Sequence, residues 1–295
     1  IDGETDYAEI AKKLDECEQV LCIASTKKEA EKIFELLDGE AMYLSTNLCP
    51  AHRRKIIREM KTRLRDGKPC RVVSTSIISV GVDIDFPVVY LQYTGLDSLI
   101  QGAGRCNREG RQSLQKSRAH IFWTKESKKS LFMRKEKQVT DMVRKKYNTK
   151  EMTEPSAIRT YFENWYQSNE GNLDYREIEK LAQSLSFAEI GKRFHLINDS
   201  TKSVFVPFDE KARNIKEQLM MGNRSRQLMR AAGAYMINVR YSKAQGQSDF
   251  MKLLTQGQIE MFPGDENLAY LVNMEDYDVE LGLKIKSEDG VGIMW

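Results

Sequence analysis

The stretch VLCIASTKKEAEKIFELL, residues 20–37, decides the fold, because a short apolar run passes directly into a helical pattern. The run VLCIAS (20–25) has the length and apolar composition of a buried strand. Thr26 stands where a helix N-cap is expected, and Glu29 occupies the matching capping-box position. The apolar residues that follow recur at helical spacing: Ala30, Ile33, Phe34 and Leu37. The stretch therefore predicts a buried strand followed by an amphipathic helix.

The same alternation continues as far as residue 125. Further short apolar runs predict strands: AMYLS (41–45), RVVSTS (71–76), VVYLQY (88–93) and AHIFWT (119–124). Helices are predicted from Pro50 onward and over LDSLIQGAG (96–104). Nearly all-apolar strands that alternate with helices are typical of a parallel sheet covered on both faces. Residues 1–125 are therefore predicted to form an α/β domain with helices on both faces of a parallel sheet.

Residues 126–190 are predicted to form a helical connector. One amphipathic helix is expected to hold Leu131 and Val143, another starts at Pro155, and a third runs over residues 175–190.

Residues 191–295 mix the two patterns and predict a small α+β accessory domain. FHLIND (194–199) and SVFVPF (203–208) are predicted to pair as a hairpin around Asp199 and Ser200. Two helices, each followed by glycine, are expected next, over NIKEQLMMG and RSRQLMRAAG. YMINVRY (235–241) and LAYLVN (268–273) are expected to be strands.

The composition is that of an ordinary soluble protein, 41% hydrophobic and 30% charged over 295 residues, with a net charge of +3. No apolar run approaches the length that spans a bilayer, so no membrane association is expected. The five cysteines are odd in number and lack a CxxC pair, which argues against a disulfide framework and a zinc site. A reducing, cytoplasmic location is expected. The chain starts at Ile1 rather than methionine, so we expect a fragment or a processed product.

Hydroxyl side chains stand at the ends of three predicted strands. They are Ser25 and Thr26, Ser45 and Thr46, and Ser74 and Thr75. Because ligands of parallel α/β sheets bind beyond the carboxyl ends of the strands, these side chains are expected to share one edge. Hydroxyls suit a phosphodiester backbone, and the alternative is that each one caps a helix. Three such pairs in register favour a site for a nucleic-acid backbone.

The stretch QGAGRCNREGR (101–111) places Arg105 and Arg108 three residues apart among glycines. Two cations on a glycine-opened backbone suit a polyanion, and phosphate is the obvious candidate. A second basic segment, residues 52–68, includes Arg53 and Arg54. These two arginines either line a DNA path or form a solvated helix surface.

In their order, these segments resemble the second RecA-like half of a superfamily-two helicase. The opening stretch resembles motif IV, VVSTSIISVGVDIDFP (72–87) resembles motif V, and QGAGRCNR (101–108) matches the motif VI pattern Q-x-x-G-R-x-x-R. YLSTNLCPAHRRKIIREM (43–60) and the tail resemble, more narrowly, the CRISPR-associated helicase–nuclease family of type I interference, with details closest to subtype I-C. The chain departs from residues frequent in that family at three positions: Ser76, Ser79 and Gly102.

The resemblance implies that nucleotide binds between two halves and that this half supplies Arg105 and Arg108 as arginine fingers. It implies nucleotide contacts at four further residues: Gln101, Gly81, Asp83 and Gly104. Asp83 would touch the ribose or orient a finger, with a turn cap as the alternative. The hydroxyl pairs, and Arg53 and Arg54 if they line the DNA path, would contact single-stranded DNA.

The sequence has no Walker A loop, no aspartate box and no HD metal cluster, and its only histidines are His52, His120 and His195. The resemblance therefore implies that ATP and Mg²⁺ are bound mainly by a first RecA-like half, which lies outside this chain together with an HD nuclease. No metal site is expected here. The Cascade surveillance complex is the implied partner.

The function expected from the resemblance is part of an ATP-dependent single-stranded-DNA translocase, moving 3′ to 5′, in CRISPR antiviral defence. The isolated chain is expected to be inactive. Two alternatives stay open: an inert nucleic-acid-binding or Cascade-binding module, and half of another superfamily-two helicase.

Overall fold

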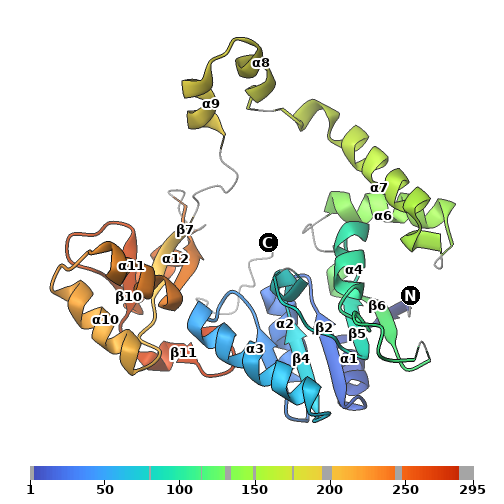
Figure 1. Ribbon diagram of the computed structural model, residues 1–295, viewed down its shortest axis with the longest axis horizontal. Coiled ribbons are helices and arrows are strands. Elements are labelled where there is room, and N and C mark those ends of the chain that lie inside the picture. The colour runs from blue at the N-terminus through green and yellow to red at the C-terminus, as the bar shows by residue number, and fades with distance from the viewer. Residues whose placement is uncertain are drawn as a thin grey trace. The chain divides into compact units, whose positions relative to one another are not determined.

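The computed structural model describes residues 3–79, 81–113, 115–129, 134–148, 151–174, 176–194, 201–242 and 248–285. The chain divides into two compact units, which are described separately (Figure 1). The first unit comprises Ile1–Tyr93, Gln101–Ser130 and Thr201–Trp295, and the second comprises Thr94–Ile100 and Leu131–Ser200. The division into three domains expected from the sequence stays a prediction.

A six-stranded sheet with the order β1-β6-β5-β2-β4-β3 lies in the first unit, and all of its strands are parallel. The strands are β1 (Gly3–Thr5), β2 (Gln19–Ile23), β3 (Met42–Leu44), β4 (Cys70–Ser74), β5 (Val88–Gln92) and β6 (Arg118–Thr124). Most of their side chains are buried, as expected of a sheet covered on both faces. The predicted α/β fold is confirmed, and β1 is the only strand of this sheet that the sequence pattern did not predict.

Helices α2 (Lys27–Glu35) and α3 (Pro50–Arg65) cover opposite faces of this sheet. The chain moves outward from β2 to β3 through α2 and returns to β4 through α3, and right-handed crossovers place such helices on opposite sides. The predicted cap of α2 is confirmed, because the Thr26 hydroxyl accepts the Glu29 backbone N–H at 3.2 Å. The other helices here are α1 (Tyr7–Asp15), the 3₁₀ helix η1 (Ser76–Ser79), α4 (Leu96–Ala103) and α5 (Lys125–Lys129).

A second, four-stranded sheet of the first unit has the order β8-β7-β10-β9. Its strands are β7 (Thr201–Phe205), β8 (Met236–Arg240), β9 (Ile259–Met261) and β10 (Leu268–Leu271), and a two-stranded sheet adds β11 (Tyr277–Asp278) and β12 (Gly282–Leu283). The helices that accompany these strands are α10 (Glu210–Met220), α11 (Arg226–Ala232), α12 (Asp249–Thr255), and the 3₁₀ helices η4 (Gly233–Tyr235) and η5 (Met274–Asp276). Strand β7 pairs with β8 and β10, and the partner strand of the predicted hairpin lies outside the described residues.

The second unit is helical, as the sequence predicted for this region. Its helices are α6 (Arg134–Lys146), η2 (Glu151–Thr153), α7 (Pro155–Ser168), η3 (Glu170–Asn172), α8 (Ile178–Gln183) and α9 (Phe187–Arg193), and the first residues of α4 belong to it. Leu96, Val139, Val143 and Tyr161 form its buried core. Residues 131–133, placed in the first predicted helix, lie outside the described residues.

The prediction of one continuous helix over residues 175–190 is wrong, because the chain forms α8 and α9 instead. Leu185 lies between them in the left-handed region, with φ of 54°, which a continuous helix cannot contain. No side chain of α8 or α9 is buried, so no core packing favours one long helix. Among the described helices, none is both long enough and apolar enough to cross a membrane.

Candidate functional site

Strands β2, β4 and β3 are neighbours in the first sheet, and their carboxyl ends meet at one edge. Ser74 ends β4 and pairs in register with Ile23 of β2 and Leu44 of β3. Ser25 and Ser45 follow those two strands within two residues. The structure thus brings the three predicted hydroxyl segments to one place, which we call the carboxyl edge.

Two of the predicted DNA-contacting hydroxyls, those of Ser45 and Ser74, are fully buried within the chain. The Ser74 hydroxyl donates to the carbonyl oxygen of Leu44 at 2.8 Å, which links β4 to the end of β3. The Ser45 hydroxyl accepts the backbone N–H of Asn47 at 3.1 Å and shapes the loop after β3. These side chains therefore hold the carboxyl edge together rather than face a ligand.

Ser25, Thr26 and Thr75 are also partly engaged inside the chain. The backbone N–H of Ser25 donates to the Gln92 side chain at 2.7 Å, and its buried hydroxyl has no partner among the described residues. The Thr26 hydroxyl caps α2. The Thr75 residue is 8% exposed, and its N–H donates to the Leu44 carbonyl at 3.2 Å. The hydrogen bonds of these three residues therefore stabilise the loops that follow the strands.

Thr46 and Ser76 are the exposed hydroxyl residues at this edge. Close to Thr46, the Lys27 ammonium donates to the Asn47 side-chain oxygen at 2.7 Å, which adds an exposed cation to the edge. The sequence reasoning did not select Lys27 or Asn47. Their positions in the sequence could have indicated them, because each directly follows a hydroxyl residue at the end of a strand. An exposed cation beside exposed hydroxyls suits a phosphodiester backbone.

Arg105, predicted as an arginine finger, is only 8% exposed. Its guanidinium donates to the carbonyl oxygens of Val82 at 2.6 Å and Ser79 at 2.5 Å. Burial lowers the pKa of Arg105, and the nearby charge of Arg108 lowers it further. Arg105 therefore ties the segment after α4 to the segment after β4, two regions that are far apart in sequence.

The backbone continues this connection beyond Arg105. The Phe86 N–H donates to the Arg105 carbonyl and the Asn107 N–H donates to the Phe86 carbonyl, both at 2.9 Å. The Asp85 carboxylate accepts the backbone N–H of Arg108 at 2.7 Å. Residues 79 and 81–86 are thus fastened to residues 105–109 by both side chains and backbone, and we call these segments the arginine clasp.

Arg108 projects outward from the arginine clasp. Its Nε lies 3.1 Å from an Asp83 carboxylate oxygen, with the two side chains 44% and 71% exposed. An exposed ion pair is weakly held and exchanges readily with another anion. The Arg108 side chain is therefore only weakly held, whereas Arg105 cannot move without breaking the clasp.

The remaining predicted residues differ in how accessible they are. Gln101 and Gly104 are exposed near the clasp, on and just after α4. Gly81 is exposed with φ of 73°, a conformation that favours glycine and leaves the backbone open to a ligand. On α3, Arg54 is exposed and Arg53 is half-buried, and burial lowers the pKa of Arg53.

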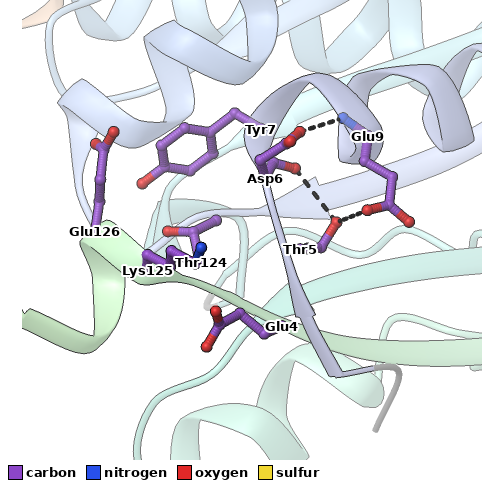
Figure 2. Close-up of a pocket in the computed structure, with 8 residues that line it drawn as sticks. All are labelled: Glu4, Thr5, Asp6, Tyr7, Glu9, Thr124, Lys125 and Glu126. Carbon is purple, nitrogen blue, oxygen red and sulfur yellow. Dashed lines mark hydrogen bonds between the residues drawn. The ribbon is translucent and has the colours of Figure 1, made fainter.

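A pocket of about 440 Å³ lies beyond the carboxyl ends of β1 and β6, which are the two strands of the same sheet farthest from β3 (Figure 2). Carboxylates dominate its lining, which includes Glu4, Asp6, Glu9 and Glu126 beside Lys125. The Thr5 hydroxyl donates to the Glu9 carboxylate at 2.7 Å within it. None of the predicted site residues lines this pocket, and its negative charge disfavours phosphate.

Across the described residues, no group of three or more His, Cys, Asp or Glu side chains could hold a metal ion. All five cysteines are free. His52 is buried against aromatic side chains, and His120 stacks on Tyr90 with ring centroids 4.6 Å apart. Both histidines are packed within the structure, and the position of His195 lies outside the described residues.

The parallel sheet with helices on both of its faces defines the class of fold: it is a RecA-like α/β fold. Residues 15–111 match the family described as CRISPR-associated nuclease/helicase Cas3, C-terminal. The fold is that of T. fusca Cas3, whose AMPPNP-bound crystal structure superposes on 96% of this chain with a TM-score of 0.59 and 15% sequence identity. The chain covers 41% of that structure.

Two curated relatives carry the same family name. The CRISPR-associated nuclease/helicase Cas3 of Methanothermobacter thermautotrophicus is 26% identical over 198 residues, covering 59% of this chain. The protein of that name from Haloferax volcanii is 37% identical over 65 residues, covering 22% of this chain. The chain spans 24% of the first relative's length and 7% of the second's. These matches support a C-terminal helicase portion of the Cas3 family, while the subtype stays a prediction.

Proposed function

We propose that this chain is one half of an ATP-dependent motor that moves along single-stranded DNA. The observation that carries the proposal is the difference in burial between the two arginines of the arginine clasp. Arg105 is buried and holds the clasp, and the Arg108 side chain is exposed and forms an ion pair with Asp83. A cation presented in this way is suited to the γ-phosphate of a nucleotide bound on an opposing half.

The proposed nucleotide contacts lie around Arg108. Gln101 and Gly104 are exposed nearby in sequence, Gly81 offers open backbone, and Asp83 orients Arg108 until phosphate replaces it. We propose ATP as the nucleotide that meets Arg108 and the exposed glycines here. The described residues include no cluster suited to Mg²⁺, so the metal is expected on the opposing half, which would supply its own phosphate loop.

The proposed DNA contacts lie at the carboxyl edge. Thr46 and Ser76 present their side chains to solvent, and Lys27 adds a positive charge. The other predicted hydroxyls, including those of Ser45 and Ser74, shape the loops that present them. Arg53 and Arg54 on α3 remain candidates for the path of the strand. Backbone contacts of this kind carry no sequence information, which suits a translocase.

The segment after β4 connects the two proposed sites. It begins at Ser74 on the carboxyl edge and reaches the arginine clasp at Ser79, Val82 and Asp83. A shift of this segment on DNA binding would move the carbonyl oxygens that hold Arg105 and the carboxylate that holds Arg108. This continuity supports a motor in which the DNA and the nucleotide influence each other.

In the intact protein, we propose, this motor unwinds target DNA in type I CRISPR defence in the cytoplasm, with a first RecA-like half and an HD nuclease outside this chain. The curated relatives are called nuclease/helicases, which supports this context. A structure described as a CRISPR RNA-guided surveillance complex in a pre-nicking state has a similar fold, with a TM-score of 0.53. This similarity supports a surveillance complex of the Cascade type as a partner.

The alternative for the isolated chain is a binding module without turnover, since a complete nucleotide site needs the opposing half. Strand displacement tests the motor. The intact protein is mixed with partial duplexes that carry either a 3′ or a 5′ single-stranded tail. ATP-dependent displacement from the 3′-tailed substrate is expected, and binding to both substrates without displacement would favour the inert module.

A further inference from the structure

Tyr277, on β11 of the carboxyl-terminal part, reaches the start of α3 near the carboxyl edge. Its hydroxyl oxygen lies 3.1 Å from the backbone nitrogen of Cys49 and 3.0 Å from Nδ1 of His52. These partners are more than two hundred residues away in sequence. Tyr277 is 4% exposed and His52 is 6% exposed, so water competes little for the three groups.

The direction of each hydrogen bond follows from the donors available. The Cys49 N–H can only donate, so the Tyr277 oxygen accepts it and the tyrosine proton is left for Nδ1 of His52. This pattern requires a neutral His52 ring with its own proton on Nε2. Burial, with a smaller contribution from the charge of Lys55, lowers the pKa of His52 to about 4. The ring is therefore neutral at neutral pH, and its Nδ1 can accept the tyrosine proton.

Apolar packing fixes the position of the Tyr277 ring. The His52 ring stacks on Phe208 with centroids 4.5 Å apart, and Tyr277 meets the same Phe208 edge-on at 6.0 Å. Cys49 is fully buried and belongs to the same apolar cluster as the second sheet. The packing of the Tyr277 ring thus positions its hydroxyl independently of the hydrogen bonds.

A second contact holds the other side of the same loop. The Leu283 N–H donates to the carbonyl oxygen of Asn47 at 2.9 Å. A Cβ atom at Gly282 would lie 2.3 Å from that same carbonyl oxygen, so only glycine permits this approach. Residues 277–283 therefore hold the loop over residues 45–49 at two points, Asn47 and Cys49.

We propose that Tyr277 is a positioning residue for this loop, fixing the shape in which Thr46 and Asn47 meet the phosphodiester backbone of single-stranded DNA. The inference rests on the proposed function, because it assumes a DNA contact at the carboxyl edge. Tyr277 itself is buried and acts through the Cys49 N–H and His52. Thr46 lies three residues before Cys49, so the loop has little length over which to absorb a change at its anchor.

The test compares Tyr277→Phe with a matched control, Tyr270→Phe, in the intact protein. Tyr277→Phe removes only the hydroxyl and keeps the ring that packs on Phe208. Tyr270 is similarly buried, at 8% exposed, and its hydroxyl bonds Glu260 on β9 rather than the loop. Three quantities are measured: amide hydrogen exchange over residues 45–49, affinity for fluorescein-labelled oligo(dT), and ATP turnover as a function of oligo(dT) concentration.

Tyr277→Phe is expected to speed exchange at the Cys49 amide roughly fivefold, as the loss of one buried hydrogen bond predicts. Affinity for oligo(dT) is expected to fall by roughly three- to tenfold, with ATP turnover at saturating DNA unchanged. Tyr270→Phe leaves all three quantities at the wild-type value. A change confined to the DNA concentration that gives half-maximal turnover would separate positioning of the loop from general damage to the fold.

Unchanged exchange at Cys49 would overturn the inference, as would faster exchange with unchanged DNA affinity, since the hydroxyl would then be only structural. An equal loss in both variants would also contradict it. If the wild-type protein itself fails to bind oligo(dT), the proposed function fails first and the inference falls with it. That failure is recognisable because it appears before any substitution is made.

Discussion

The arginine clasp and the carboxyl edge use polar side chains in the same two ways. In the clasp, Arg105 is buried and bonds two carbonyl oxygens, while Arg108 is exposed and held by one carboxylate. At the edge, Ser74 is buried and bonds a carbonyl oxygen, while Ser76 is exposed. In each region one residue is buried and holds the structure, and a neighbour two or three positions away is exposed.

Residues of the same type in one motif therefore need not share a role. A buried polar group whose partners are lost leaves unsatisfied acceptors behind, so its substitution lowers stability. An exposed group in a weak pair contributes little to stability and is available to a ligand. Stability and function are therefore expected to separate between the two members of each pair.

The largest expected effect is the loss of ATP turnover in Arg108→Ala. In the intact protein we expect turnover to fall by roughly 10³-fold or more, as for other arginine fingers in phosphoryl transfer. The free energy of unfolding should change by less than about 0.5 kcal/mol, because the Asp83 pair is exposed. Steady-state kinetics and urea unfolding measure the two quantities.

Arg111→Ala is the matched control, because Arg111 is an exposed arginine of the same segment that pairs with Glu109 at 2.5 Å. It should keep nearly wild-type turnover. Equal losses in both variants would mean that the segment contributes only general positive charge, and the comparison would fail.

The main expected effect of Arg105→Ala is a lower free energy of unfolding. Removal of the guanidinium leaves the carbonyl oxygens of buried Ser79 and half-buried Val82 without their donor, which is expected to cost about 3 kcal/mol in the free energy of unfolding. Arg105→Lys should restore only part of this, because an ammonium lacks the fork that reaches both oxygens. Urea unfolding at pH 7.5 measures both variants. A loss below about 0.5 kcal/mol in Arg105→Ala would show that the clasp is not held by this side chain.

The buried contact between Tyr277 and His52 is expected to make the stability of the folded chain depend on pH. His52 has its pKa lowered to about 4 in the folded chain, below the ordinary value of 6.5. The unfolded chain therefore binds more protons between these values, and stability falls as pH drops from about 6.5 toward 4, by at most ~3 kcal/mol. Above pH 6.5 this contribution is fully present.

Urea unfolding at pH 7.5 and pH 5 tests this expectation, with His52→Asn as the control. The asparagine oxygen can still accept the Tyr277 proton but does not titrate. The variant should lose less stability between the two pH values than the wild type does. The same pH dependence in both proteins would assign the effect to other groups.

The smallest expected effects separate Ser74 from Ser76. Ser74→Ala should lower the free energy of unfolding by about 1 kcal/mol, because it removes a buried hydrogen bond to Leu44. Ser76→Ala should leave stability nearly unchanged and weaken oligo(dT) binding roughly two- to threefold. Fluorescence anisotropy and urea unfolding, performed on both variants, give the comparison. It is contradicted if Ser76→Ala unfolds more easily than Ser74→Ala.

Much of the first sheet was predictable, because buried parallel strands are nearly all apolar and their helices carry clear caps such as Thr26. The sequence also predicted that the carboxyl ends of β2, β3 and β4 meet at one edge, because the strands of a parallel sheet all run in the same direction. The burial of Arg105, Ser45 and Ser74 did not follow, since a motif gives residue types but not which side chain turns inward. The contact of Tyr277 with Cys49 was also beyond the sequence pattern, because it joins residues 228 positions apart. The break at Leu185 depends on a single backbone conformation that leucine rarely adopts.

The most direct test of the central claim is ATP turnover stimulated by single-stranded DNA, measured in parallel on this chain alone and on the intact protein. The account predicts no turnover above background for the chain alone, because Arg108 has no opposing phosphate loop to complete. The intact protein should show turnover that rises with oligo(dT) concentration. ATP turnover by the chain alone would contradict the assignment of this chain as one half of a DNA-driven motor. So would ATP turnover by the intact protein that does not change with oligo(dT) concentration.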